Sequence, residues 1–257
     1  MSDNPPTEPL PSEQETKAFP VIQAVERAAI MLAAFTPQRP RITLGEITAA
    51  LGTSKATAHR YTKALRDVNL IRFDAGEVLY SLGPQILTLA AAARAGLPVI
   101  KSAEVHMEQL LREVRETVVL SVWDGESPIV VATNDNTDQV ARVTVRVGAR
   151  LSPTASAQGR VFCAFLPPED VPMLRTEIHS NLEFADELER IRATLVSVKS
   201  PVVNGLRTLS APVFAGGRVV AALAVVAASV SVSGDIDRHI AALKRTAENL
   251  SRDLGQG

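Results

Sequence analysis

Two helix-start signals lie close together between residues 43 and 55, and they limit strongly what this chain can fold into. Thr43-Leu44-Gly45-Glu46 fits a capping box, in which the Thr and Glu side chains each bind a free backbone N–H group. Gly52, a residue common at helix ends, closes the short first helix. Thr53-Ser54 then begins a second helix, predicted to run from Lys55 to about Val68. Two short helices joined by a tight turn that contains glycine indicate a helix-turn-helix.

A β-hairpin pattern follows directly. Leu70–Phe73 and Val78–Leu82 are β-prone runs, and the glycine-containing segment Asp74–Glu77 separates them. A hairpin in this position predicts a winged helix, which we expect to span residues 20–83 with a first helix beginning at Pro20. The apolar stripe of that first helix is predicted to contain Val25, Ala28, Ala29, Leu32 and Phe35.

The remaining chain divides into a tail, a linker and a second domain. Residues 1–19 contain four acidic residues and four of the sixteen prolines, so we expect this tail to be disordered. Residues 84–96 are predicted to form a linker helix that Gly96 closes. Residues 97–257 alternate helical and antiparallel-strand patterns, which predicts an α+β domain.

Within this second domain the pattern predicts five helices and five strands. The helices are expected at Val99–Val114, Ser156–Phe165, Pro168–Ile178, Phe184–Val198 and about Asp235–Leu254. The strands are expected at Val118–Trp123, Ile129–Ala132, Val140–Val147, Thr208–Phe214 and Val219–Ala227. Ala215-Gly216-Gly217 joins the last two strands.

The charge is unevenly distributed along the chain. The net charge is −1, but residues 20–83 carry 8 basic and 5 acidic side chains, whereas residues 1–19 carry 1 and 4. Between residues 53 and 73 five basic side chains stand against one acidic side chain. A charge run on its own is as consistent with a solvated helix face as with binding. On the second helix of a helix-turn-helix, which enters the major groove, it favours double-stranded DNA.

Several other functions are disfavoured. One cysteine, Cys163, allows no disulfide framework or Cys-based zinc site within one chain, and the four histidines form no ligand pair, so no metal or cofactor is expected. Ten aromatic residues are few for a surface that stacks single-stranded bases. The longest aliphatic run, Val219–Val230, is too short for a membrane span, and no secretory signal is present, so we expect a soluble cytoplasmic protein.

The candidate DNA contacts are polar or basic residues on the second helix and the wing. They are Thr53, Ser54, Lys55, Thr57, His59, Arg60, Lys63 and Arg72. We expect Ser54, Lys55, Thr57 and Arg60 to meet bases or nearby phosphates, and Lys63 and Arg72 to hold the backbone. His59 is equally consistent with a base contact and with a place at the edge of the packing.

Motifs along the chain resemble the IclR-type transcriptional regulators. They are residues 43–47, 51–60, 80–84, 116–118, 147–151, 154–160 and 204–214, in order within about residues 21–228. The resemblance implies a winged helix followed by a GAF-like domain that binds a small effector. It also implies a homodimer, often paired into a dimer of dimers, that represses or activates nearby operons.

This chain departs from the family pattern at three places. Thr208 stands where the family usually has Cys, Lys199 replaces a residue that is usually acidic, and Ala224 and Val226 align with two frequent serines. The resemblance, together with these departures, implies an effector site made of Ser156, Ala157, Gln158, Lys199, Leu206, Thr208, Ala224 and Val226. Lys199, with Gln158, is predicted to contact an anionic or polar group of an otherwise apolar effector, the alternative being that it is exposed to solvent.

Alternatives remain open at several positions. Ser156 to Gln158 begin a helix whose N-terminus favours an anion, and a simple capped helix start is an equal explanation. Cys163 has apolar neighbours and is expected to be inert, and Trp123 is expected to pack in the core. A second domain that only oligomerises is the main alternative to effector binding. An enzyme with a DNA-binding head is disfavoured, because no catalytic set with recognisable spacing is present.

Overall fold

The computed structural model describes residues 22–135, 145–171, 181–199, 206–228 and 236–255. It divides the chain into two compact units, one containing residues up to Phe35 together with Arg41–Ser81, and one containing Thr36–Pro40 together with Leu82–Gly257. Each unit has its own hydrophobic core. Among the described residues no single helix has the length and apolar character to cross a membrane. The helices Pro84–Ala95 and Pro98–Val114 reach that length and apolar character only when they are taken together, and a bend of 76° separates them.

The N-terminal unit is a winged helix, as predicted. Its elements are α1 (Gln23–Ala33), β1 (Arg41–Ile42), α2 (Leu44–Leu51), α3 (Lys55–Asp67), β2 (Ile71–Asp74) and β3 (Leu79–Leu82). The strands form a small sheet in the order β1-β3-β2. The core between helices and sheet consists of Met31, Phe35, Ile42, Ile47, Ala58, Leu65, Ile71 and Tyr80.

The start and stop signals of α2 and α3 act as their sequence predicts. Thr43 Oγ1 accepts a hydrogen bond from the Glu46 N–H at 3.2 Å, and Glu46 Oε2 accepts one from the Thr43 N–H at 2.8 Å. Gly52 ends α2 in the left-handed conformation, with φ of 55°. Ser54 caps α3 by accepting from the Thr57 N–H at 3.3 Å. These side-chain bonds satisfy donors that a helix start leaves free, which fixes both boundaries.

Two details of this unit differ from the sequence prediction. The predicted stripe on the first helix is wrong in its N-terminal half, because Val25 is 65% exposed and Ala29 is exposed, while Met31 and Phe35 carry the buried contact. The helix is held by its C-terminal half, and its predicted start at Pro20 lies outside the described residues. The strand β1 was not expected, because two residues are too few to show alternation and their pairing with β3 defines them.

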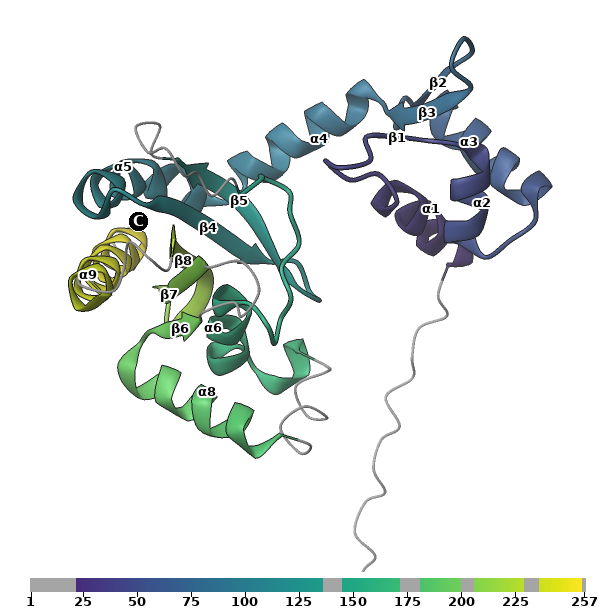
Figure 1. Cartoon of the computed structure of the whole chain (residues 1–257). Coiled ribbons are helices and arrows are strands. Elements are labelled where there is room, and N and C mark those ends of the chain that lie inside the picture. The colour runs from purple at the N-terminus through teal and green to yellow at the C-terminus, as the bar shows by residue number, and fades with distance from the viewer. Residues whose placement is uncertain (1–21, 136–144, 172–180, 200–205, 229–235, 256–257) are drawn as a thin grey trace, which may run out of the picture. The chain divides into compact units, whose positions relative to one another are not determined.

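The C-terminal unit is built on a five-stranded antiparallel sheet in the order β5-β4-β8-β7-β6 (Figure 1). The strands are β4 (Thr117–Trp123), β5 (Pro128–Asn134), β6 (Ser197–Lys199), β7 (Leu206–Ala215) and β8 (Arg218–Ala228). The helices are α4 (Pro84–Ala95), α5 (Pro98–Val114), α6 (Ala157–Phe165), the short η1 (Pro168–Asp170), α8 (Leu182–Thr194) and α9 (Ile236–Gly255). Helices α5 and α9 form one hydrophobic core with the sheet, and helices α6 and α8 form another.

Alternation along β7 and β8 decides which side chains face which helices. Leu209, Ala211 and Val213 join the core with α5 and α9, so their neighbours Thr208 and Ser210 point to the α6 side. The two strands are joined through Gly216 and Gly217, which both have positive φ (55° and 76°), as a tight hairpin of this type requires.

Two predicted elements of this unit are corrected, and a third, the helix over Pro168–Ile178, lies mostly outside the described residues. The helix predicted over Phe184–Val198 ends at Thr194, because Leu195 turns left-handed (φ 57°) and Ser197–Lys199 then pairs with β7 as the edge strand β6. Of the strand predicted over Val140–Val147, the described residues 145–147 lie in a loop and turn, and the rest lies outside the described residues. The helix predicted from Pro168 is described only as the single turn η1. The remaining predicted helices and strands are confirmed within a few residues.

Candidate nucleic-acid interface and ligand pocket

The α3 helix has one buried and one basic face. Ala58, Thr62 and Leu65 are buried against the core, and the buried Thr62 hydroxyl is satisfied because it donates to the His59 carbonyl at 2.9 Å. The opposite face exposes four of the predicted DNA contacts, which are Lys55, His59, Arg60 and Lys63. The wing residue Arg72 is also exposed. The basic residues of this set are Lys55, Arg60, Lys63 and Arg72. Within the described part of the chain they form no ion pair, so their charges are available to a polyanion.

The other predicted contacts are partly engaged inside the unit. Ser54 Oγ, which caps α3, also donates to Thr57 Oγ1 at 3.1 Å, and Thr53 and Thr57 are half-buried. These residues shape the first turn of α3. If these residues also contact DNA, they do so in addition to stabilising the start of α3.

The tip of the wing is organised by its acidic residues. Asp74 Oδ1 accepts hydrogen bonds from the N–H groups of Gly76 (2.9 Å) and Glu77 (3.2 Å), which closes the turn. Glu77 forms an ion pair with Arg41 of β1. The guanidinium of Arg66 lies 5.4 Å from the centre of the Phe73 ring, a cation–π contact that joins α3 to the wing. Sequence patterns alone gave no sign of either long-range contact.

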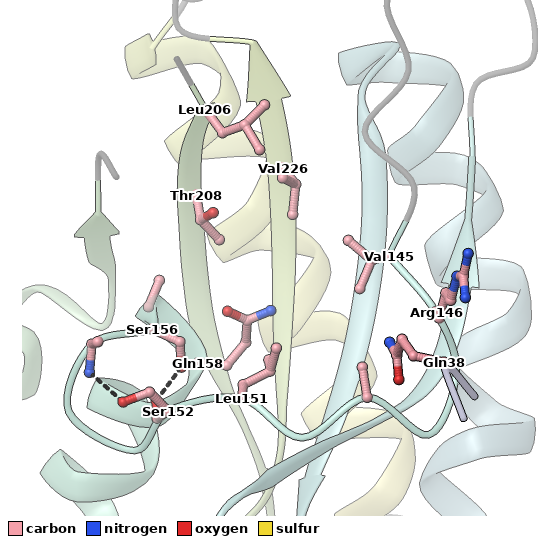
Figure 2. A pocket seen from close by; sticks show the side chains of 13 residues that line it. Gln38, Val145, Arg146, Leu151, Ser152, Ser156, Gln158, Leu206, Thr208 and Val226 are labelled. Carbon is pink, nitrogen blue, oxygen red and sulfur yellow. Dashed lines mark hydrogen bonds between the residues drawn. The ribbon is translucent and has the colours of Figure 1, made fainter. Parts of the chain in front are cut away.

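A cavity of about 530 Å³ opens in the C-terminal unit (Figure 2). It lies between the start of α6, the segment 145–151 and the strands β7 and β8. Most of its wall is apolar, formed by Val145, Ala149, Leu151, Ala155, Leu206 and Val226. A size of several hundred Å³ and an apolar wall with few polar groups are typical of small-molecule sites.

The two serines at the cavity are committed to the loop that forms it. Ser156 Oγ donates to the Ser152 carbonyl at 2.6 Å and accepts from the Gly159 N–H at 2.9 Å. Ser152 Oγ accepts from the Ala155 N–H at 3.0 Å. Ser156 therefore caps α6, which agrees with the simpler of the two explanations that the sequence allowed. Besides the exposed Gln38 and Arg146, the polar lining side chains that make no hydrogen bond to any described residue are Gln158 and Thr208.

Behind the cavity, α6 is held by Arg160. The Arg160 Nε donates to the Thr154 carbonyl at 2.8 Å, and the guanidinium forms an ion pair with Glu187. The guanidinium carbon lies 5.3 Å from the centre of the Phe184 ring. Burial lowers the pKa of the Arg160 guanidinium from its ordinary value, and the nearby Cys163 partly opposes this shift. Cys163 is fully buried, as expected, but it has a basic neighbour that a reading of adjacent residues could not find.

Trp123 is half-buried and packs against the core that contains α6 and α8, as expected. Its ring centre lies 5.6 Å from that of Phe162, and its Nε1 donates to the Asp170 carbonyl at 3.2 Å. Within the described ranges no group of three or more His, Cys, Asp or Glu side chains could hold a metal ion.

Family models match both units. The model of the bacterial transcriptional regulator IclR C-terminal domain matches residues 91–252, and that of the IclR helix-turn-helix domain matches residues 24–75. The chain belongs to the IclR family. The resemblance inferred from the short motifs is therefore confirmed, and with it the α+β fold class with an N-terminal helix-turn-helix.

Named relatives and solved structures agree with IclR membership. The HTH-type transcriptional regulator Rv1719 of Mycobacterium tuberculosis is 31% identical over 194 residues, which covers 70% of this chain and 71% of that protein. The structure of an IclR transcriptional regulator from Silicibacter sp. TM1040 has a TM-score of 0.81 at 24% identity, covering 90% and 96%. An IclR homologue from Microbacterium hydrocarbonoxydans, solved in complex with 4-hydroxybenzoate, has a TM-score of 0.75 at 21% identity, covering 90% and 98%.

Most positions that the IclR resemblance pointed to lie around the cavity. Six of the eight line it, namely Ser156, Ala157, Gln158, Leu206, Thr208 and Val226. Ala224 is fully buried and packs with Val119, Val130 and Val226, so it lies behind the wall. The backbone of Lys199 pairs with Thr208 in the sheet, and its side chain lies outside what the structure describes.

The sequence reasoning missed one wall of the cavity. The IclR-like motif Val147–Leu151 was recognised but not assigned to the site, and Ala149 and Leu151 line the cavity together with Val145, Ser152 and Ala155. This segment reaches the site because its backbone bonds to β5. The Val130 N–H donates to Ala149 and the Leu151 N–H donates to Pro128, at 3.0 and 2.9 Å. Such bonds have no pattern of their own in the sequence.

Proposed function

We propose that this IclR-family protein is a transcriptional regulator that binds operator DNA through α3 and changes its operator affinity when a small molecule fills the cavity. The observation that carries the proposal is the pairing of two features in one chain. One is a helix-turn-helix with unpaired exposed cations on its second helix, and the other is a mainly apolar cavity with unpaired polar groups.

On the DNA side, the first turn of α3 would enter the major groove. Lys55 and Arg60 would meet base edges or nearby phosphates, helped by Thr53, Ser54, Thr57 and His59, while Lys63 and Arg72 would bind the backbone. A homodimer, with a dimer of dimers as its larger form, would place two such helices on half-sites about one helical turn apart, or a multiple of that distance. The operator is then near-palindromic.

On the effector side, six cavity residues and Lys199 would contact the ligand, and Ala224 would support the wall from behind. The backbone pairing of Lys199 with Thr208, which lines the cavity, supports the proposal that residue 199 contacts an anionic or polar group of the ligand. The 4-hydroxybenzoate in the Microbacterium protein supports a small organic effector for this fold. The effector would act by favouring one dimer geometry over another with different operator affinity.

A second domain that only assembles the oligomer is the alternative, since the Cys and the two Ser residues frequent in the family are replaced by Thr208, Ala224 and Val226. We do not propose enzymatic activity, because the relatives are named as regulators. A gel-shift titration of the full chain against DNA from beside its own gene tests DNA binding. Thermal melting against a panel of metabolites separates the two alternatives, because a ligand that binds only the folded state raises the Tm.

A further inference from the structure

Gln158 is a buried amide that lacks a described partner. Only 4% of the residue is exposed, and its side chain makes no hydrogen bond with any residue that the structure describes. Figure 2 shows the amide pointing from α6 into the cavity, toward the strands that carry Thr208 and Val226. The polar atoms of the amide are not sealed off from the cavity, so a ligand group that enters can replace water as their hydrogen-bond partner. The amide is therefore placed to bind something that enters the cavity.

Thr208 supplies a second polar group on the strand side of the same cavity. It is half-buried on β7, opposite Val226 of β8, and its side-chain hydroxyl makes no hydrogen bond to a described residue. The serines at the cavity differ, because Ser152 and Ser156 already use their hydroxyls within the loop. Gln38 and Arg146 also line the cavity, but both are exposed. Among the buried and half-buried lining residues, Gln158 and Thr208 are thus the side chains that remain available to a polar head group.

The chemistry of these two side chains indicates what that head group is. An amide has both N–H donors and a carbonyl acceptor, and a hydroxyl also donates and accepts. A carboxylate only accepts, so it would leave the Gln158 carbonyl facing a negative oxygen in a place with little water. An ammonium only donates, and no described lining residue is acidic. A hydroxyl or a carboxamide can satisfy both sides of the Gln158 amide.

The rest of the lining can accommodate an uncharged ligand. Arg146 is the single charged residue among the described lining residues, and it is exposed. The free N–H groups in the first turn of α6, at Ala157 and Gln158, can donate hydrogen bonds to an oxygen with partial negative charge, including a carbonyl oxygen. The remaining wall around Leu151, Leu206 and Val226 can only pack against an apolar body.

We propose that the cavity selects a compact, mainly apolar molecule whose uncharged head group both donates and accepts hydrogen bonds, and that Gln158 determines this selection. The inference rests on the proposed function, in which the cavity is the effector site. Hydroxyl and carboxamide compounds share the required chemistry, and the arms of the experiment separate them.

The test compares three probes that share a ring and differ in the head group: benzamide, benzyl alcohol and benzoate. Isothermal titration calorimetry and thermal melting are run on the full chain and on its Gln158→Leu and Thr208→Val variants. Benzamide or benzyl alcohol is expected to bind at least about tenfold more tightly than benzoate, the factor that one buried hydrogen bond supplies. Gln158→Leu is expected to lose about tenfold in affinity for the preferred probe, and Thr208→Val is expected to lose less.

The unliganded variants separate selection from a structural role. Because Gln158→Leu replaces an unpaired buried amide by an apolar side chain of similar size, its Tm is expected to equal or exceed that of the parent. A structural Gln158 would instead lower the Tm when replaced. Equal or tighter binding of benzoate, unchanged binding in Gln158→Leu, a lowered Tm in this variant, or no binding of any probe at millimolar concentration would each overturn the proposal.

A DNA-binding measurement distinguishes a failure of this inference from a failure of the proposed function. The same preparations are titrated with DNA from beside the gene in a gel shift. Binding of benzoate alone, with DNA binding intact, would remove the head-group assignment and leave the ligand-responsive regulator in place. Absence of DNA binding with the expected probe selectivity would remove the regulator and keep the ligand class.

Discussion

A Cβ atom on Gly159 would lie 2.3 Å from the carbonyl oxygen of Pro153. The same atom would lie 2.4 Å from the carbonyl oxygen of Ser152, so the loop rests directly on the first turn of α6. Both atoms belong to the backbone and cannot rotate away. Because Ser152 also lines the cavity, the shape of the ligand site depends on the absence of a side chain at residue 159.

Gly159→Ala is expected to destabilise the C-terminal unit. Forcing a methyl group against two carbonyls requires a backbone shift, and overpacking of this kind costs about 1–3 kcal/mol of unfolding free energy. Urea denaturation followed by circular dichroism measures the change. Gly45→Ala is the matched control, since its nearest atom would lie 3.6 Å away within α2, where Ala stabilises a helix by up to about 1 kcal/mol. Equal stability of Gly159→Ala and the parent would contradict the packing described for the loop.

Local chemistry made much of the fold predictable. The cap at Thr43, the left-handed Gly52 and the cap at Ser54 are all short-range signals, and the alternation along β7 and β8 depends only on neighbouring residues. The strands β1 and β6 were missed for the opposite reason. They have two and three residues, and only their hydrogen bonds to β3 and β7 define them as strands.

The candidate site was predictable in part for the same reason. The start of α6 and the position of Thr208 follow from local pattern, and family resemblance assigned them to one site. That Gln158 is buried without a described partner follows from how α6 lies against the sheet, which no sequence window contains. The contribution of Val145 to the wall likewise comes from a segment that the sequence pattern assigned to a strand.

Lys63→Ala is expected to weaken DNA binding to a similar extent on all sequences. Lys63 is exposed on α3, and a lysine that neutralises one phosphate releases counterions. The slope of log K against log salt concentration should therefore decrease in magnitude by about 0.9. Fluorescence anisotropy with operator and unrelated duplex DNA at several salt concentrations measures it. Arg112→Ala, which removes an exposed arginine paired with Glu108 in the other unit, should leave the slope unchanged.

Arg60→Ala should instead act on sequence preference. If Arg60 contacts a base edge, its loss costs about 1–3 kcal/mol on the operator and little on unrelated DNA. The ratio of the two affinities, taken from the same anisotropy titrations, is the relevant quantity. A parallel loss on both DNAs would place Arg60 on the phosphate backbone and leave base reading to other residues of α3.

Phe162→Leu is expected to change the fluorescence of Trp123, the only tryptophan of the chain. Phe162 is fully buried and lies 5.6 Å from Trp123 between ring centres. Replacing the ring removes this contact and leaves a small void, with a cost of about 1.5 kcal/mol or less if the site repacks. Emission spectra and urea titrations should report the change together. An unaltered spectrum would mean that Trp123 does not pack on α6.

Val78→Asn is expected to stabilise the winged-helix unit. Val78 is 62% exposed at the end of the wing turn and has φ of 57°, a left-handed conformation in which a β-branched side chain crowds the backbone. Asn tolerates this conformation better, so the substitution should raise the unfolding free energy by about 1 kcal/mol, at the lower end of the cost of left-handed geometry. Thermal melting and urea denaturation measure the gain. Val68→Asn is the matched control, because Val68 is 55% exposed with φ of −104° and has no such strain to relieve. A gain at both positions would reflect the loss of an exposed apolar side chain, and a gain at Val78 alone would identify backbone strain as the cause.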